Sequence, residues 1–100
     1  MPFEIRFKDE SLEKLERDTK QDAGYQTGIG KMFRRRMQLI RGAADERDFY
    51  ALKSLHYEKL KGDREHQRSM MLNDQWRLVL EVEDGNPNKV IWIVNIEDYH

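Results

Sequence analysis

The sequence predicts an α+β domain: a twisted, mostly antiparallel four-stranded sheet with two N-terminal helices packed on one face, in the order β-α-α-β-β-β. Three observations predict it. Residues 3–7 and 76–83 alternate in polarity as a half-buried strand does, residues 29–40 repeat apolar side chains at helical spacing, and turn residues separate the later segments. A chain of 100 residues has core for one domain, which we expect to span 1–100.

The N-terminal part predicts one strand and two helices. After the strand at 3–7, Asp9 is a suitable N-cap for a helix that runs to about residue 20. A second helix is expected from near Thr27 to near Gly42, with Gly42 as the residue that ends it. Its apolar face consists of Ile29, Phe33, Met37 and Ile40.

The rest of the chain predicts three strands. Residues 45–65 are polar and irregular, with a tight turn at Gly62. The strands are expected at 66–72, 76–83 and 89–97. The last of these is apolar on both faces, which is typical of a central strand.

Several classes of protein are excluded at this point. The chain has no cysteine, so it has neither disulfides nor a thiolate zinc site. Its longest apolar stretch, 90–94, is too short to span a bilayer, and the N-terminus has no pattern of a secretion signal. We therefore expect a cytoplasmic protein with no membrane contact.

The formal net charge of −1 hides a gradient along the chain. Residues 1–30 carry a net charge of −2, residues 31–77 carry +5, and residues 78–100 carry −4. A basic middle segment is compatible with local binding of phosphate, because the field of the patch decides that interaction. The ordinary alternative is that these charges are solvated helix faces.

One group of residues has the chemistry needed to cleave RNA without a metal, which takes a base, cations at the phosphate and an acid. Alternation places Arg77 on the sheet face away from Leu78, and the turn with Lys61 and Arg64 leads into the neighbouring strand. The segment Asp98-Tyr99-His100 continues the central strand to the rim of the sheet. The ordinary alternative is that Arg77 is simply an exposed residue of a strand, and that the last residues of the chain are frayed and have no function.

The same residues resemble a known family. Three segments are similar to the HigB-type toxins of the RelE/ParE superfamily: Leu60-Lys61-Gly62-Asp63-Arg64, Asn73-Asp74-Gln75-Trp76-Arg77 and Glu97-Asp98-Tyr99-His100. The resemblance implies a RelE-like fold and an endoribonuclease that cleaves mRNA in the ribosomal A site. It also implies a HigA-like helix-turn-helix antitoxin as a partner. The toxin would bind operator DNA only as part of its complex with that antitoxin.

The resemblance also assigns roles to residues. It implies that Lys61, Arg64 and Arg77 bind and stabilise the scissile phosphate, and that Asp98, Tyr99 and His100 supply acid–base and orienting groups. It implies neither a metal nor a cofactor. His56 has two readings, an RNA contact or a role in loop packing, because its spacing from Leu60 is longer than in some relatives. We interpret His66 as structural.

Two other functions remain open from the sequence. One is a non-enzymatic inhibitor of DNA gyrase, as the ParE toxins of the same superfamily are. The other is an inactive relative that is kept as an antitoxin-binding corepressor. The Tyr99-His100 pair favours the nuclease over both, because neither alternative requires it.

Overall fold

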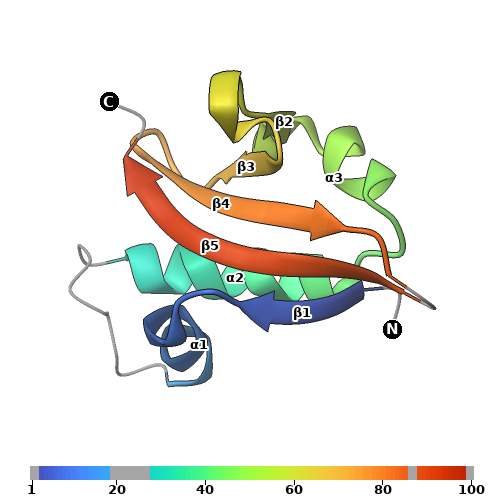
Figure 1. The fold of residues 1–100 in the computed structure, drawn as a ribbon. Helices are drawn as coiled ribbons and strands as arrows, with labels where there is room; N and C mark the ends of the chain where they lie inside the picture. The colour runs from blue at the N-terminus through green and yellow to red at the C-terminus, as the bar shows by residue number, and fades with distance from the viewer. Residues whose placement is uncertain (1–2, 19–27, 86–87, 99–100) are drawn as a thin grey trace.

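A five-stranded mixed sheet forms the centre of the computed structural model, which describes residues 3–18, 28–85 and 88–98 (Figure 1). The order across the sheet is β1-β5-β4-β3-β2. The strands are β1 (Phe3–Phe7), β2 (Glu58–Lys59), β3 (Gln67–Met71), β4 (Trp76–Glu83) and β5 (Lys89–Asp98). Only the pairing of β1 with β5 is parallel among the described strands, so the expected mostly antiparallel sheet is confirmed.

Helices cover one face of this sheet (Figure 1). Within the described ranges, the helical elements are α1 (Glu10–Arg17), α2 (Ile29–Gly42), α3 (Arg47–Ala51) and two short 3₁₀ turns, η1 (Lys53–Leu55) and η2 (Gly62–Arg64). In Figure 1, α2 crosses behind the sheet with α1 beside it, whereas α3 lies near the β2 edge. The expected packing of two N-terminal helices on one face is therefore observed.

The ends of the helices follow from local chemistry. The carboxylate of Asp9 accepts a hydrogen bond from the backbone N–H of Ser11 at 2.9 Å, which confirms the predicted N-cap of α1. The helix ends at Arg17, earlier than expected. The start of α2 is preceded by Gly28, whose φ of 96° favours glycine, while the expected start at Thr27 lies outside the described residues. Gly42 is the last helical residue of α2 rather than a left-handed residue beyond it.

The core lies between the apolar face of α2 and the inner face of the sheet. Phe33, Met37 and Ile40 are fully buried, as their spacing predicts. They belong to one cluster with strand residues that include Leu78, Leu80, Ile91 and Ile93. This packing fixes which face of each strand points inward.

The basic residues of α2 mainly support the fold. Arg34 donates to the backbone oxygen of Leu15 at 2.8 Å, and Arg36 donates to that of Met71 at 2.8 Å. Arg41 forms a two-pronged ion pair with Glu16, at 2.7 and 2.8 Å. Three of the twelve Lys and Arg residues in the basic segment 31–77 therefore join α2 to α1 and β3.

Two expectations about the fold were wrong. The sheet has five strands rather than four, because Glu58 and Lys59 pair with β3 as the short edge strand β2. Residues 45–65 are also not irregular, since they form α3, η1, β2 and η2. Both exposed residues of β2 are charged, and α3 has five residues, so neither segment is long enough to show a period.

Strand β4 has the two faces that its alternation predicts. Leu78 and Leu80 are fully buried in the core. Arg77 and Glu81 lie on the opposite face, where they pair across β5 with Glu97 and Trp92. We call this polar side, away from α1 and α2, the outer face of the sheet.

Truncating the centre of the core tests this packing. Phe33→Ala should lower the free energy of unfolding by ~3–5 kcal/mol, because it leaves a cavity between α2 and the sheet. Arg35→Ala, on the exposed side of the same helix, should change it by less than about 0.5 kcal/mol. Urea denaturation followed by circular dichroism measures both, and equal midpoints for the two variants would contradict the assignment.

Candidate functional site

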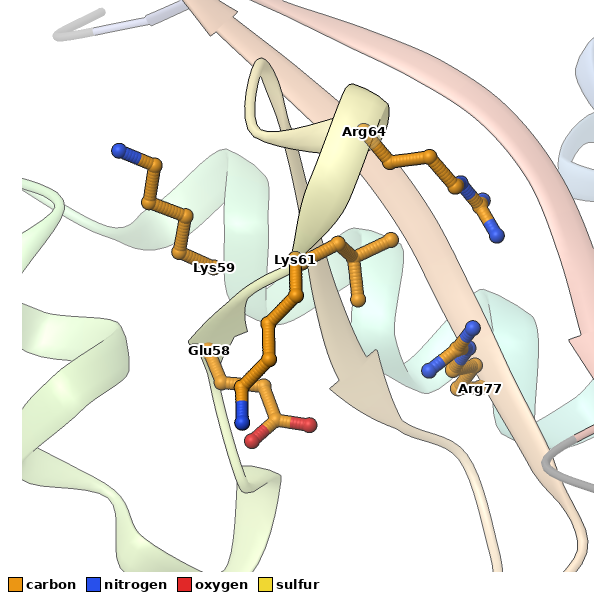
Figure 2. A pocket seen from close by; sticks show the side chains of 6 residues that line it. Glu58, Lys59, Lys61, Arg64 and Arg77 are labelled. Atoms are coloured by element: carbon orange, nitrogen blue, oxygen red, sulfur yellow. The ribbon is translucent and has the colours of Figure 1, made fainter.

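A pocket of about 380 Å³ opens where β2, η2 and the start of β4 meet (Figure 2). It is lined by Glu58, Lys59, Leu60, Lys61, Arg64 and Arg77. Four of these residues are cationic and one is anionic, so the lining has a net charge of +3. The pocket is therefore suited to an anionic group.

The turn between β2 and β3 positions the first two cations. Gly62 has a φ of 71°, which lets the chain turn into η2 directly after Lys61. The backbone N–H of Leu60 donates to the oxygen of Gln67 at 3.1 Å and closes this turn. Lys61 and Arg64 thus enter the pocket from the two ends of a short, closed loop.

The third cation comes from the sheet itself. Arg77 is the second residue of β4, and it lies between Met71 of β3 and Glu97 of β5. Its neighbour Leu78 is buried in the core, so alternation directs Arg77 to the outer face. The side chain of Arg77 is 19% exposed, and it lines the pocket.

Glu97 joins two of these cations. Its carboxylate accepts hydrogen bonds from Nη1 and Nη2 of Arg64 at 3.1 and 2.7 Å, and from Nη2 of Arg77 at 3.1 Å. The bonds from Arg64, helped by Arg77, hold the pKa of Glu97 below its ordinary value although burial acts the other way. The same contact raises the pKa of Arg64.

A chain of polar contacts holds Arg64 from its other side. Nε of Arg64 donates to Oε1 of Gln67 at 2.9 Å, and Nε2 of Gln67 donates to Glu81 at 3.0 Å. Nζ of Lys8, at the end of β1, lies 2.9 Å from the second oxygen of Glu81. Burial acts to raise the pKa of Glu81, but the hydrogen bonds from Gln67 and Lys8 outweigh it and lower that pKa.

The sequence predicted three of the pocket residues, since Lys61, Arg64 and Arg77 all line it. It assigned no role to two carboxylates, that of Glu58, which lines the pocket, and that of Glu97, which binds two of the lining arginines. In Figure 2 the carboxylate of Glu58 lies beside the chain of Lys61, whereas the amine of Lys59 points away from the two arginines. A cross-strand pairing of Glu97 with Arg77 was the only signal available, and it requires the register to be known.

The other expected site residues lie elsewhere or are not described. Asp98 pairs with Trp76, one position beyond the Arg77–Glu97 pair, so it belongs to the inner face of the sheet. Its carboxylate accepts a hydrogen bond from Gln75 at 3.0 Å. His56 is exposed at the end of η1 with a φ of 48°, and it is not among the described residues that line the pocket. Tyr99 and His100 lie outside the described residues.

The arrangement is suited to binding a phosphodiester. Two arginines and two lysines line a pocket that opens to solvent, and guanidinium pairs with phosphate through two parallel hydrogen bonds. Cations fixed before the substrate arrives can stabilise the negative charge that develops at a reacting phosphorus.

A comparison with models of protein families shows the family to which the chain belongs. Residues 5–100 match the model of HigB-like toxins, described as the RelE-like toxin of the type II toxin–antitoxin system HigB. The chain belongs to this family. Membership implies a cognate antitoxin as its partner.

Solved structures agree on the fold of this HigB-like toxin. The YoeB/ParE toxin from Agrobacterium tumefaciens superimposes with a TM-score of 0.61 at 17% identity, covering 97% of this chain and 99% of that chain. YafQ from E. coli superimposes with a TM-score of 0.60 at 12% identity, covering 96% of this chain and 92% of that chain. The YoeB dimer from Staphylococcus aureus superimposes with a TM-score of 0.59 at 23% identity, covering 100% of this chain and 99% of that chain. No curated protein sequence matches the chain.

Neither a membrane span nor a metal site was found in the described part of the chain. None of its helices is both long enough and apolar enough to cross a bilayer. No cluster of three or more His, Asp or Glu side chains in the same part is arranged as metal ligands.

The lowered pKa of Glu97 makes part of the stability dependent on pH. The folded-state pKa lies below the unfolded value of about 4.3, so the Glu97 contribution is complete above that value and is lost as the pH falls through the folded pKa. Glu97→Gln should lower the free energy of unfolding by ~1–3 kcal/mol at pH 7, because charge-assisted hydrogen bonds are lost.

Urea denaturation of both proteins from pH 7 to pH 3 measures this effect. The difference between wild type and Glu97→Gln should be constant down to about pH 5 and should shrink below about pH 4. A difference that grows with acidity would contradict the described contacts.

Proposed function

We propose that this HigB-like toxin is a ribosome-dependent endoribonuclease that cleaves mRNA in the ribosomal A site by metal-independent attack of the 2′-OH. The observation that carries the proposal is that Lys61, Arg64 and Arg77, from two separate segments, line one open pocket. A phosphate held there would meet cations from two sides.

The proposed reaction is an internal displacement at phosphorus. The 2′-oxygen bonds to phosphorus and gives its proton to a base, while the bond to the 5′-oxygen breaks and that oxygen takes a proton from an acid. The products are a 2′,3′-cyclic phosphate and a 5′-hydroxyl end. Lys61, Arg64 and Arg77 stabilise the additional negative charge of the pentacoordinate phosphorus.

The acid–base groups of this proposal are Tyr99 and His100, which follow Glu97 and Asp98 in the sequence. Histidine is suited to the role because its ordinary pKa lies near neutrality. Asp98 lies on the inner face and accepts a hydrogen bond from Gln75, so its proposed role is to orient the residues that follow it rather than to contact the phosphate. We keep His56 as an RNA contact outside the pocket, since it is exposed only two residues before β2.

Dependence on the ribosome fits the charge of the protein. The whole chain has a formal net charge of −1, so it attracts free RNA weakly over long distances. The ribosome would instead present the mRNA phosphate to the pocket in a fixed position, and such positioning lowers a reaction barrier without new chemistry.

The proposed setting is the cytoplasm, where translation takes place. A HigA-like helix-turn-helix antitoxin would neutralise the toxin, and operator DNA would be reached only through that complex. Family membership supports an antitoxin, and the helix-turn-helix type is part of the proposal.

Arg77→Ala tests the nuclease directly. The change should lower the rate of mRNA cleavage by about 10²-fold or more, because it removes a fixed cation from the pocket. Primer extension on mRNA, after induction in cells or after mixing with translating ribosomes, should show cuts in register with the reading frame for wild type and not for the variant.

Arg35→Ala is the matched control, since it removes an arginine that is exposed on α2, far along the sequence from the pocket segments. It should cleave like wild type. Intact mRNA together with a DNA-damage response would indicate a gyrase inhibitor instead, and intact mRNA with normal growth would indicate an inactive corepressor.

A further inference from the structure

Glu97 occupies the hydrogen-bond donors that an RNA phosphate would use. Its two carboxylate oxygens accept from both terminal nitrogens of Arg64, and one of them also accepts from Arg77. A carboxylate and a phosphate are bound by arginine with the same two-pronged geometry. The carboxylate of Glu97 is therefore bound to two of the four cationic residues that line the pocket.

This contact also lowers the charge of the pocket. The lining residues carry a net charge of +3, and Glu97, which forms ion pairs with two of them, reduces the sum to +2. The side chain of Glu97 is 23% exposed, so water screens its effect on the arginines only in part. An incoming phosphate must compete with it or share the guanidinium groups with it.

Arg64 does not depend on Glu97 alone for its position. Its Nε is held by Gln67, which is held by Glu81, and the described bonds use three of the five N–H groups of the guanidinium. A phosphate that displaced Glu97 would therefore meet an arginine that is still oriented toward the pocket. The arrangement allows an exchange of anions without loss of the site.

We propose that Glu97 is an internal counter-ion of the pocket, which competes with RNA phosphates for Arg64 and Arg77 and so sets how weakly the free toxin binds RNA. The inference rests on the proposed function, because it takes RNA phosphate as the ligand of the pocket. It makes Glu97 a residue that determines specificity: a single phosphate is not enough to displace the internal anion, and contacts elsewhere along a positioned RNA strand are needed as well.

If Glu97 instead only holds Arg64 and Arg77 in position, its removal would make both side chains more mobile and weaken the binding of RNA. If Glu97 competes with phosphate, its removal should strengthen the binding of RNA. The sign of the change in affinity thus separates the two roles, and the isosteric substitution Glu97→Gln keeps the size and acceptor oxygen of the side chain while it removes the charge.

The experiment measures binding of a short single-stranded RNA whose 2′-hydroxyls are methylated, so that it cannot be cleaved. Fluorescence anisotropy at several salt concentrations gives Kd for the wild type and for Glu97→Gln. We expect the variant to bind about threefold tighter or better at low salt. Its logarithmic salt dependence should be steeper by up to ~0.7, the value for one more phosphate neutralised on a single strand.

Glu83→Gln is the control for charge, because it removes the same charge from an exposed position at the far end of β4. Its Kd should stay within about twofold of wild type. A Glu97→Asp variant keeps the charge, but its shorter side chain cannot reach both arginines as Glu97 does. Glu97→Asp should show a smaller gain in RNA affinity than Glu97→Gln. If circular dichroism shows that Glu97→Gln is unfolded, the test rests on Glu97→Asp.

Unchanged or weaker binding by the folded Glu97 variants would overturn the inference, and so would an equal gain in Glu83→Gln. Failure of all the proteins to bind the RNA at low salt would overturn it too. These outcomes are separate from primer extension on ribosomes, which decides the proposed nuclease without reference to Glu97.

Discussion

The pairing of β4 with β5 determines both the core and the candidate site. Leu78 faces Ile96 on the inner side, and Arg77 faces Glu97 on the outer side. A shift of one residue in either strand would exchange these faces and bury a charged pair. Burial of the leucine thus holds the arginine in the pocket, so the hydrophobic effect at the core positions the electrostatics of the outer face.

The sequence alone predicted those parts of the fold in which the period of one element is visible. Strand β4 was predicted with its observed bounds, because eight residues alternate in polarity, and Asp9 was predicted as an N-cap from its place before α1. Strand β2 could not be predicted, because a two-residue strand has no period. It exists only through its contact with β3, which no local pattern contains.

The site was predictable for residues whose position depends on one element, and not for those that depend on register. Arg77 follows from alternation in β4, and Lys61 and Arg64 follow from a turn around Gly62. Glu97 could not be assigned, because β5 is apolar on both faces and its pairing with β4 shifts between Val79 and Leu80. An irregularity of this kind cannot be counted from the sequence, and it decides which carboxylate faces which arginine.

The charge gradient along the chain acquires a structural meaning at this site. The basic middle segment supplies Lys61, Arg64 and Arg77, and the acidic last segment supplies Glu97 beside them. Antiparallel pairing of β4 with β5 brings the two segments together, so the near-neutral total comes from cancellation inside the site as well as on the surface. A toxin built in this way keeps a cationic pocket without a strongly basic surface. Under the proposed function, its attraction for RNA would depend on how closely a phosphate is brought to the arginines, because the phosphate would compete with the carboxylate of Glu97 only at short range.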